Sequence, residues 1–222
     1  MKKTEKNLYI LCAVFAALLV CSNCIAAKQI PIGKWFGLDI AITAGIICYP
    51  LTFLVTDIIG EIWGKGEAKK AVIGGFIGQV IAVLLIILAN LLPSSDPSMK
   101  TMFNSVLGSN WILIISSLTA CILSQTWDVW IFHKIRNAYI KRHGSTEHGK
   151  WIWNNIGTIT SQFIDSAVFY VGVIIMLATM GINLTFSEIV VTVFAYWVIK
   201  IVIALLDTFV FYFFTRKADK RW

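Results

Sequence analysis

Six ionisable side chains stand inside apolar stretches of this 222-residue sequence, where a charge is unfavourable. Each ionised group in a hydrocarbon environment costs about 2.5–3.5 kcal/mol on insertion scales, so such groups persist where they pair, face a cavity or carry a function. The sequence therefore predicts one shared polar interior for the whole set, which consists of Asp57, Glu61, Asp128, Asp165, Lys200 and Asp207.

The spacing within this set places its members on common helical faces. Asp57 and Glu61 are four residues apart, and Lys200 and Asp207 are seven apart, so each pair shares a face. Glu61 can also be interpreted as a residue wetted at the end of its helix. Lys200 is either a counter-ion to one of the aspartates or a direct contact of a substrate.

A short repeat adds amide groups to two of the acids. The segments 124–132 and 161–169 both follow the pattern S-Q-x-x-D-x-x-x-F, with Gln125 three residues before Asp128 and Gln162 three before Asp165. Consecutive membrane helices run in opposite directions, so two such faces in contact would form a pseudo-symmetric polar pocket, as in transporters built from internal repeats. A chance match of nine residues is the alternative.

Further polar and aromatic groups lie near the repeat. Asn155 brings an amide to the start of the second repeat helix, and its neighbour Asn154 is interpreted as a helix cap. Trp127 and Trp130 flank Asp128, where they either belong to an interfacial aromatic belt or stack on a flat ligand.

Several chemistries are excluded or disfavoured. The phosphate-binding motif G-x-x-x-x-G-K-[ST] does not occur, and the three histidines lack H-E-x-x-H spacing. The five cysteines lie in apolar runs, and Cys21-x-x-Cys24 lacks a second metal-binding pair, so packing is the favoured interpretation. We expect no enzyme activity, no catalytic residue, no metal site and no cofactor.

The elements that must position these groups are membrane helices. Hydrophobic residues make up 58% of the sequence and charged residues 14%, against about 45–50% and about 25% in soluble domains. Six runs reach the ~20 residues that cross a bilayer, the first of them interpreted as an uncleaved helix: residues 8–27, 38–62, 71–92, 111–132, 152–180 and 189–214. The sequence predicts an all-α polytopic membrane protein, a six-helix transmembrane bundle forming a single domain over residues 1–222.

Charge distribution predicts the orientation of the bundle. Fifteen of the nineteen Lys and Arg residues fall at the two termini and in the second and fourth loops, and such loops stay in the cytoplasm. We therefore expect a cell-membrane protein with both termini cytoplasmic and the lipid bilayer as its environment. The basic residues form no contiguous stripe, which argues against nucleic-acid binding. Gly74-x-x-x-Gly78 indicates close packing within the bundle or, alternatively, a homodimer.

Three blocks of the sequence resemble the queuosine precursor transporter family, also called the vitamin uptake transporter group. Residues 49–61, YPLTFLVTDIIGE, are similar to a family signature of the form P-L-T-F-L-x-T-D-x-x-x-E, and Gly64 closes it. Residues 154–166, NNIGTITSQFIDS, resemble a second block, and the Gln125/Asp128 segment a third. Asn154, Gly157 and Ser166 depart from the Arg, Ser and Thr that are common there.

The resemblance implies import of 7-deazaguanine bases, namely queuine and its cyano and aminomethyl precursors. A carboxylate can accept the adjacent N–H donors of a guanine edge, amides can serve the remaining ring atoms, and an aromatic ring can cover the face. The expected substrate-binding residues are Gln125, Trp127, Asp128, Trp130, Asn155, Gln162 and Asp165. The expected gate or proton-linked network consists of Asp57, Glu61, Lys200 and Asp207. The alternatives are a membrane-embedded binding subunit with a separate ATP-driven partner, and a structural scaffold.

Overall fold

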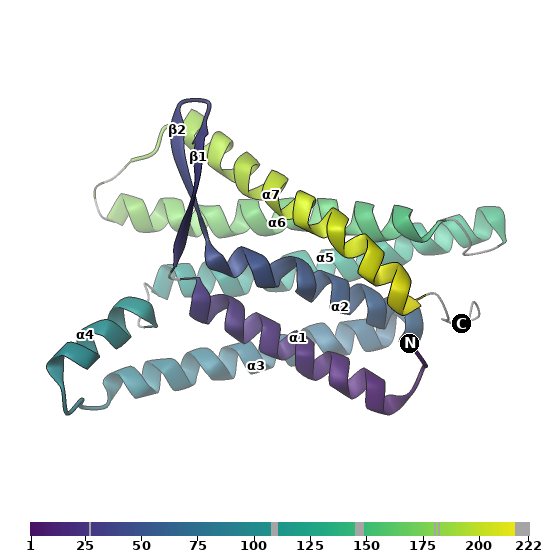
Figure 1. Cartoon of the computed structure of the whole chain (residues 1–222), viewed down its shortest axis with the longest axis horizontal. Coiled ribbons are helices and arrows are strands. Elements are labelled where there is room, and N and C mark those ends of the chain that lie inside the picture. The colour runs from purple at the N-terminus through teal and green to yellow at the C-terminus, as the bar shows by residue number, and fades with distance from the viewer. Residues whose placement is uncertain (27, 108–110, 145–148, 180, 182, 216–222) are drawn as a thin grey trace.

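The computed structural model describes residues 1–26, 28–107, 111–144, 149–179, 181 and 183–215. Long helices run lengthwise beside one another, and a β-hairpin and a short helix project at one end (Figure 1). The elements in chain order are α1 (Glu5–Ile25), β1 (Gln29–Trp35), β2 (Leu38–Thr43), a 3-10 turn (Ala44–Ile47), α2 (Cys48–Trp63), α3 (Lys65–Leu91), α4 (Pro97–Val106), α5 (Trp111–His143), α6 (Lys150–Thr179) and α7 (Phe186–Thr215). Expected helix ends at residues 27 and 180 and the basic residues Arg216, Lys217, Lys220 and Arg221 lie outside the described residues.

Local signals explain where several helices begin and end. Thr4 caps α1 by accepting a hydrogen bond from the backbone N–H of Asn7 at 3.3 Å. Gly64 has a φ of 101°, a conformation that favours glycine, and it separates α2 from α3 with a one-residue turn. Asp96 caps α4, and Pro97 occupies its first turn.

The β-hairpin corrects one part of the predicted fold. Residues 38–43 were expected to begin the second helix, but they form β2, which pairs antiparallel with β1, and α2 begins only at Cys48. Phe36 and Gly37 form the two-residue turn with φ values of 50° and 87°, the pattern of a type I′ hairpin. Ile40 and Ile42 alternate onto one face and are buried against α7 near Tyr196.

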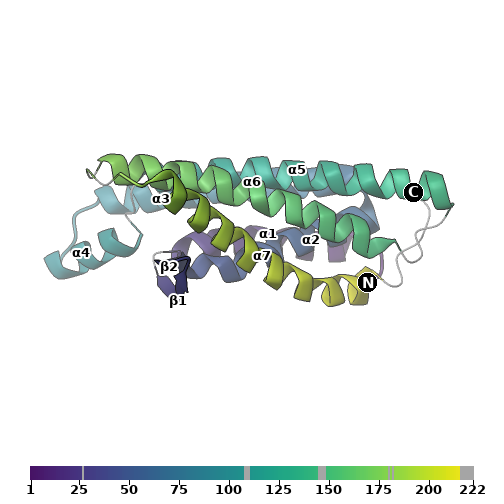
Figure 2. The ribbon, with the colours of Figure 1, turned by 90° about the horizontal axis from the view of Figure 1, so that it is seen from above.

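The bundle is organised around α2. Buried positions make up 83% of the residues in its apolar window, against 22% in α1, α3 and α7. Helix α1 packs on α2 and α3, α7 crosses α2 and α6, and α5 lies along α6, as both views show (Figures 1 and 2). The central position of α2 explains why its polar side chains are inside the protein.

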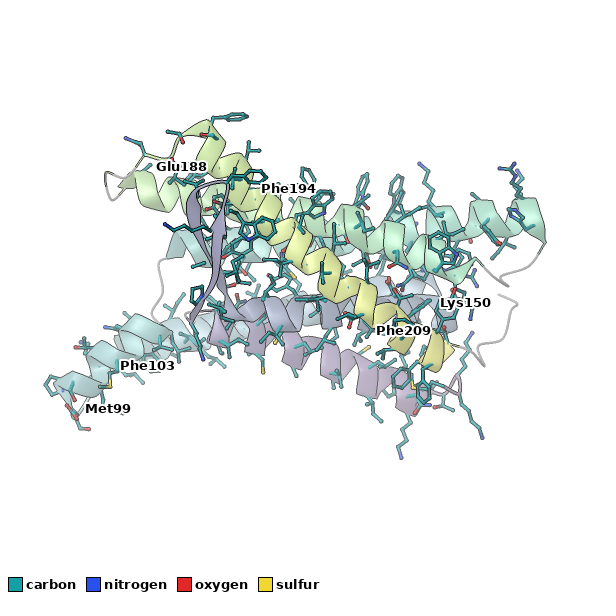
Figure 3. All side chains as sticks on the ribbon, turned by 45° about the horizontal axis from the view of Figure 1, so that its top comes forward. Met99, Phe103, Lys150, Glu188, Phe194 and Phe209 are labelled. Carbon is teal, nitrogen blue, oxygen red and sulfur yellow. The ribbon has the colours of Figure 1, made fainter. Side chains whose placement is uncertain are left out.

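Five helices in the described part of the chain are long and apolar enough to cross a membrane, namely α1, α2 with its preceding turn, α3, α6 and α7. The expected fourth span falls within α5, a helix of 33 residues that is not among these five, so this span stays a prediction. The outer surface of the bundle carries large apolar side chains, including Phe194 and Phe209 on α7 (Figure 3). Such a surface suits a lipid environment.

The two ends of the described chain meet at one end of the bundle. The Met1 amine donates a hydrogen bond to the carbonyl oxygen of Phe214, at the end of α7. The hairpin and α4 lie at the opposite end (Figure 1). Met1 and the end of α7 therefore lie on the same side of the bundle.

Candidate functional site

A small cavity of about 40 Å³ lies within the bundle, in the half that carries the hairpin. The end of α1, the start of α2, α5, α6 and α7 all contribute to its wall. The polar side chains that line it include Asn23, Tyr49, Ser117, Asp165, Ser166 and Lys200. The cavity thus brings together groups that are far apart in the sequence.

An ion pair joins two helices at this cavity. The Lys200 ammonium on α7 donates to the Asp165 carboxylate on α6, and the two side chains are only 6% and 2% exposed. The Tyr49 ring lies 4.8 Å from Lys200 Nζ, a cation–π distance. Of the two interpretations of Lys200, the structure shows the counter-ion, and the same ammonium also faces the cavity.

Two further groups on α6 are buried without a partner. Neither the oxygen nor the nitrogen of the Gln162 amide forms a hydrogen bond within the described residues, although Gln162 is fully buried. The Ser166 hydroxyl, which lines the cavity, also lacks a partner there. Because a buried polar group without a hydrogen bond costs about 1–3 kcal/mol, these atoms indicate a place where a ligand or water could bind.

The two S-Q-x-x-D segments meet in a reciprocal arrangement. Ser124 on α5 donates to Asp165 Oδ1 on α6 at 3.2 Å, and Ser161 on α6 donates to Asp128 Oδ1 on α5 at 2.9 Å. Each serine of one repeat therefore binds the aspartate of the other. The predicted contact between the two repeat faces is present.

The two repeat glutamines have different surroundings. The Gln125 amide nitrogen donates to Thr52 Oγ1 at 2.9 Å, and its oxygen accepts from Thr56 Oγ1 at 3.3 Å. Gln125 is 1% exposed and ties α5 to α2. Gln162 has no equivalent partners in the described chain and is the more available of the two.

A second pair of acids lies next to the repeat. The carboxyl groups of Asp57 on α2 and Asp128 on α5 are within hydrogen-bonding reach of each other, and Asp57 also contacts the Thr158 hydroxyl on α6. Both aspartates are buried, with 3% and 0% exposure. Two carboxyl groups in contact in a buried site can persist only if they share a proton.

Glu61 lies in an ionic cluster at the other end of the bundle. Arg136 Nε on α5 contacts Glu61 Oε2 at 2.8 Å, and Lys150 Nζ on α6 lies 3.7 Å from Oε1. Lys150 also donates to the Thr215 carbonyl at 2.8 Å, beside the end of α7 (Figure 3). Glu61 is 2% exposed, so it is an interior residue and is not wetted at the edge of its helix.

The remaining predicted site residues lie away from the cavity lining. Trp127 and Trp130 are each 38% exposed, contact each other at 5.1 Å between ring centroids, and face outward. Asn155 is partly exposed and accepts a hydrogen bond from Thr208 on α7 at 3.0 Å. Asp207 is partly exposed. Their predicted roles stay predictions.

The cavity also includes residues that the sequence reasoning did not assign to the site. Tyr49 is the first residue of the block 49–61, and Ser166 is the last residue of the block 154–166. Neither was predicted to bind the substrate. Ser117 carried no signal beyond being polar within an apolar run, and Arg136, which pairs with Glu61 away from the cavity, carried none beyond its charge. Their positions depend on how each helix is rotated, which spacing along one helix does not reveal.

Comparisons with known proteins agree with this architecture. A family model described as "Putative vitamin uptake transporter" matches residues 43–214. A protein of Bacillus subtilis (strain 168) named "Probable queuosine precursor transporter" is 30% identical over 153 residues, which are 68% of this chain. The match spans 62% of that protein, less than two thirds of its length. No solved structure matches. Because the family model extends from the end of the hairpin to the end of α7, the chain belongs to the vitamin uptake transporter family.

Proposed function

We propose that this chain is a cell-membrane transporter that imports 7-deazaguanine precursors of queuosine, and that it binds them at the cavity between α6 and α7. The name of the Bacillus subtilis relative supports the substrate class. The observation that carries the proposal is the buried polar face of α6: Asp165 pairs with Lys200 of α7 at the cavity, Ser166 also lines it, and Gln162, which has no partner among the described residues, lies three residues before Asp165.

The ion pair complements the edge of a guanine-like ring. Such an edge presents a carbonyl oxygen beside two N–H donors. The Asp165 carboxylate can accept the two donors as a fork, while the Lys200 ammonium can donate to the neighbouring carbonyl. Substrate binding would then replace the direct contact between the two side chains with contacts from each to the base.

The neighbouring groups complete this site. The Gln162 amide supplies one acceptor and two donors that have no partner within the described residues, so it can orient the ring. The Tyr49 ring, already beside Lys200, can cover the aromatic face. The proposal covers the neutral cyano form as well as the cationic aminomethyl and queuine forms.

We take the structure to be a closed state, because the cavity is small. Pockets that hold small molecules usually have volumes of about 300–1,000 Å³, whereas this one measures about 40 Å³. A base can therefore enter only after the helices move apart. Alternating access requires such a closed form between the outward-open and inward-open forms.

The proposed orientation places both termini in the cytoplasm, as the distribution of Lys and Arg favours. The cavity then lies in the outer half of the membrane, and the cluster of Glu61, Arg136 and Lys150 closes the inner half. We propose that import is linked to proton movement, because buried acids that carry no fixed counter-ion can take up and release protons.

Uptake by the purified chain in liposomes tests this function. We expect accumulation of a labelled deazaguanine, with strong loss in Asp165→Asn and Gln162→Ala. Gln79→Ala is the matched control, because Gln79 is a buried glutamine on α3, a helix that contributes no residue to the cavity lining. Transport by the purified chain alone would also distinguish it from a binding subunit that needs an ATP-driven partner. Unchanged uptake in both α6 variants would refute the proposed site.

A further inference from the structure

The contact between Asp57 and Asp128 has a different character from the ion pairs elsewhere in the bundle. Both carboxyl groups are at least nine-tenths buried, and they face each other. Ser161 donates to Asp128 Oδ1, but Oδ2 of the same carboxyl group receives no hydrogen bond from the described residues. A proton carried by one of the two acids would satisfy this contact.

Three basic groups on the helices around Asp57 and Asp128 have other acids as partners. Lys200 of α7 binds Asp165, while Arg136 of α5 and Lys150 of α6 hold Glu61, one turn along α2 from Asp57. Of the other acidic, basic and histidine side chains on α5, α6 and α7, His133 is buried and Glu188 and Asp207 are partly exposed. The remaining ones, Lys134, Lys141, Arg142 and His143, are exposed. The buried residues of α1 and α3 within the described chain are neither acidic nor basic.

The repeat makes the contrast between the two aspartates informative. Asp165 and Asp128 occupy equivalent places in the two S-Q-x-x-D segments, and each accepts a hydrogen bond from the serine of the other segment. The next partner of Asp165 is the Lys200 ammonium, whereas the next partner of Asp128 is the Asp57 carboxyl group. A proton between the two acids therefore takes the place that a lysine cation holds at the equivalent position.

We propose that Asp57 and Asp128 form the proton-binding site that couples transport to a proton gradient. This inference rests on the proposed transport function and assigns Asp128 to coupling, with Asp165 serving the substrate. The bound proton holds α2 against α5. Its release leaves two carboxylates in contact, and their repulsion favours separation of these helices.

The serine contacts connect this pair to the substrate cavity. Ser161, which binds Asp128, precedes Gln162 on α6, and Asp165 is one turn further along the same helix. A movement of Asp128 away from α2 would therefore shift α6 beside the cavity. This short path provides a physical link between proton release and opening of the substrate site.

Proteoliposome transport separates coupling from substrate recognition. With the membrane potential held at zero, an inward gradient of one pH unit drives at most about a tenfold accumulation for one proton per substrate. We expect Asp57→Asn and Asp128→Asn to lose this accumulation while they keep substrate exchange at equal pH, because an Asn amide can donate to the remaining carboxylate. Asp96→Asn, at the exposed cap of α4, is the matched control and should accumulate substrate like the unaltered protein.

Infrared spectroscopy tests the proton site without any transport. The unaltered protein should show the carbonyl stretch of a buried protonated carboxylic acid, which is absent in Asp57→Asn and in Asp128→Asn. Gradient-driven accumulation that persists in both variants, or a protonated-acid band that is unchanged in both, would overturn the inference. Loss of exchange together with accumulation in these variants would also overturn it. Failure of the unaltered protein to transport any deazaguanine would instead refute the proposed function.

Discussion

Replacing Lys200 by Met tests whether the ion pair at the cavity is a single buried unit. The substitution removes the charge and keeps much of the side-chain volume. Asp165, 2% exposed, would then hold an uncompensated carboxylate with the Ser124 hydroxyl as its remaining described donor. Removing one partner of a buried pair costs about 3–5 kcal/mol. We expect about 3 kcal/mol, because the serine hydrogen bond remains.

The companion variants make this prediction quantitative. Asp165→Asn alone should also destabilise the protein, because it leaves the Lys200 ammonium with the Tyr49 ring as its described contact. The double variant, Asp165→Asn with Lys200→Met, removes both charges and should recover most of the loss, since replacing a whole buried pair is often nearly neutral. A double-mutant cycle should therefore give a coupling energy of about 2–3 kcal/mol.

Reversible unfolding in mixed detergent, followed by tryptophan fluorescence, measures these free energies. Lys70→Met is the control, because Lys70 forms an exposed pair with Glu67 and its loss should leave stability unchanged within error. Additive effects of the two cavity substitutions, or a change below about 1 kcal/mol for Lys200→Met, would refute the idea that a buried ion pair holds α6 to α7.

Three other substitutions test the packing, each by the same unfolding measurement. Gly75→Ala should cost about 1–3 kcal/mol, because a Cβ there would lie 2.3 Å from a phenylalanine ring carbon of α1. Gly74→Ala should not destabilise the protein, because there is open space around Gly74. Equal losses of stability in both variants would contradict close packing at Gly75. Trp153→Ala should cost about 3–5 kcal/mol because the ring is fully buried, whereas Trp151→Ala should have little effect because that ring is 54% exposed. Tyr196→Phe should cost about 1 kcal/mol and increase protease cleavage in the hairpin, because the Tyr196 hydroxyl accepts a backbone hydrogen bond from β2. Unchanged cleavage would show that this bond does not anchor the hairpin.

The positions of the long helices could be predicted because apolar runs of membrane length are visible in one dimension. The hairpin was not predicted, although the alternation of a strand is present in the sequence. Leu38, Ile40 and Ile42 alternate with Asp39 and Ala41, which indicates a strand. The alternation lies directly before the apolar run of α2, so hydropathy alone merges the two segments. The strand is stabilised by burial of the two isoleucines against α7, which is far away in the sequence.

The tryptophans next to Asp128 differ from it in exposure. Successive residues on a helix point about 100° apart, and side chains i and i+1 do not face each other. Asp128 is 0% exposed, whereas Trp127 and Trp130 are each 38% exposed. Gln125, three residues before Asp128, is buried on the same side. Spacing of three or four residues therefore predicted the interior face, and adjacency in sequence did not.

The reciprocal serine contacts follow from the spacing of the repeat. Serine and aspartate are four residues apart in each segment, so they lie one turn apart on one face. When two such helices run antiparallel, the serine of each comes opposite the aspartate of the other, as Ser124 with Asp165 and Ser161 with Asp128. The sequence could predict this contact. It could not predict the second partner of each aspartate, because α7 and α2 reach them through tertiary packing.

That second partner gives the two halves of the repeat different chemistry. Two identical ion pairs would respond in the same way to substrate and to pH, and a transporter needs sites that respond differently. Lys200 carries a fixed charge at one aspartate, so that position favours a ligand with matching donors and acceptors. Asp57 stands beside the other aspartate, so the proton that we propose they share would make that position respond to pH. A symmetric scaffold with asymmetric partners thus puts the two proposed sites side by side, since Ser161, which contacts Asp128, and Asp165 lie one turn apart on α6.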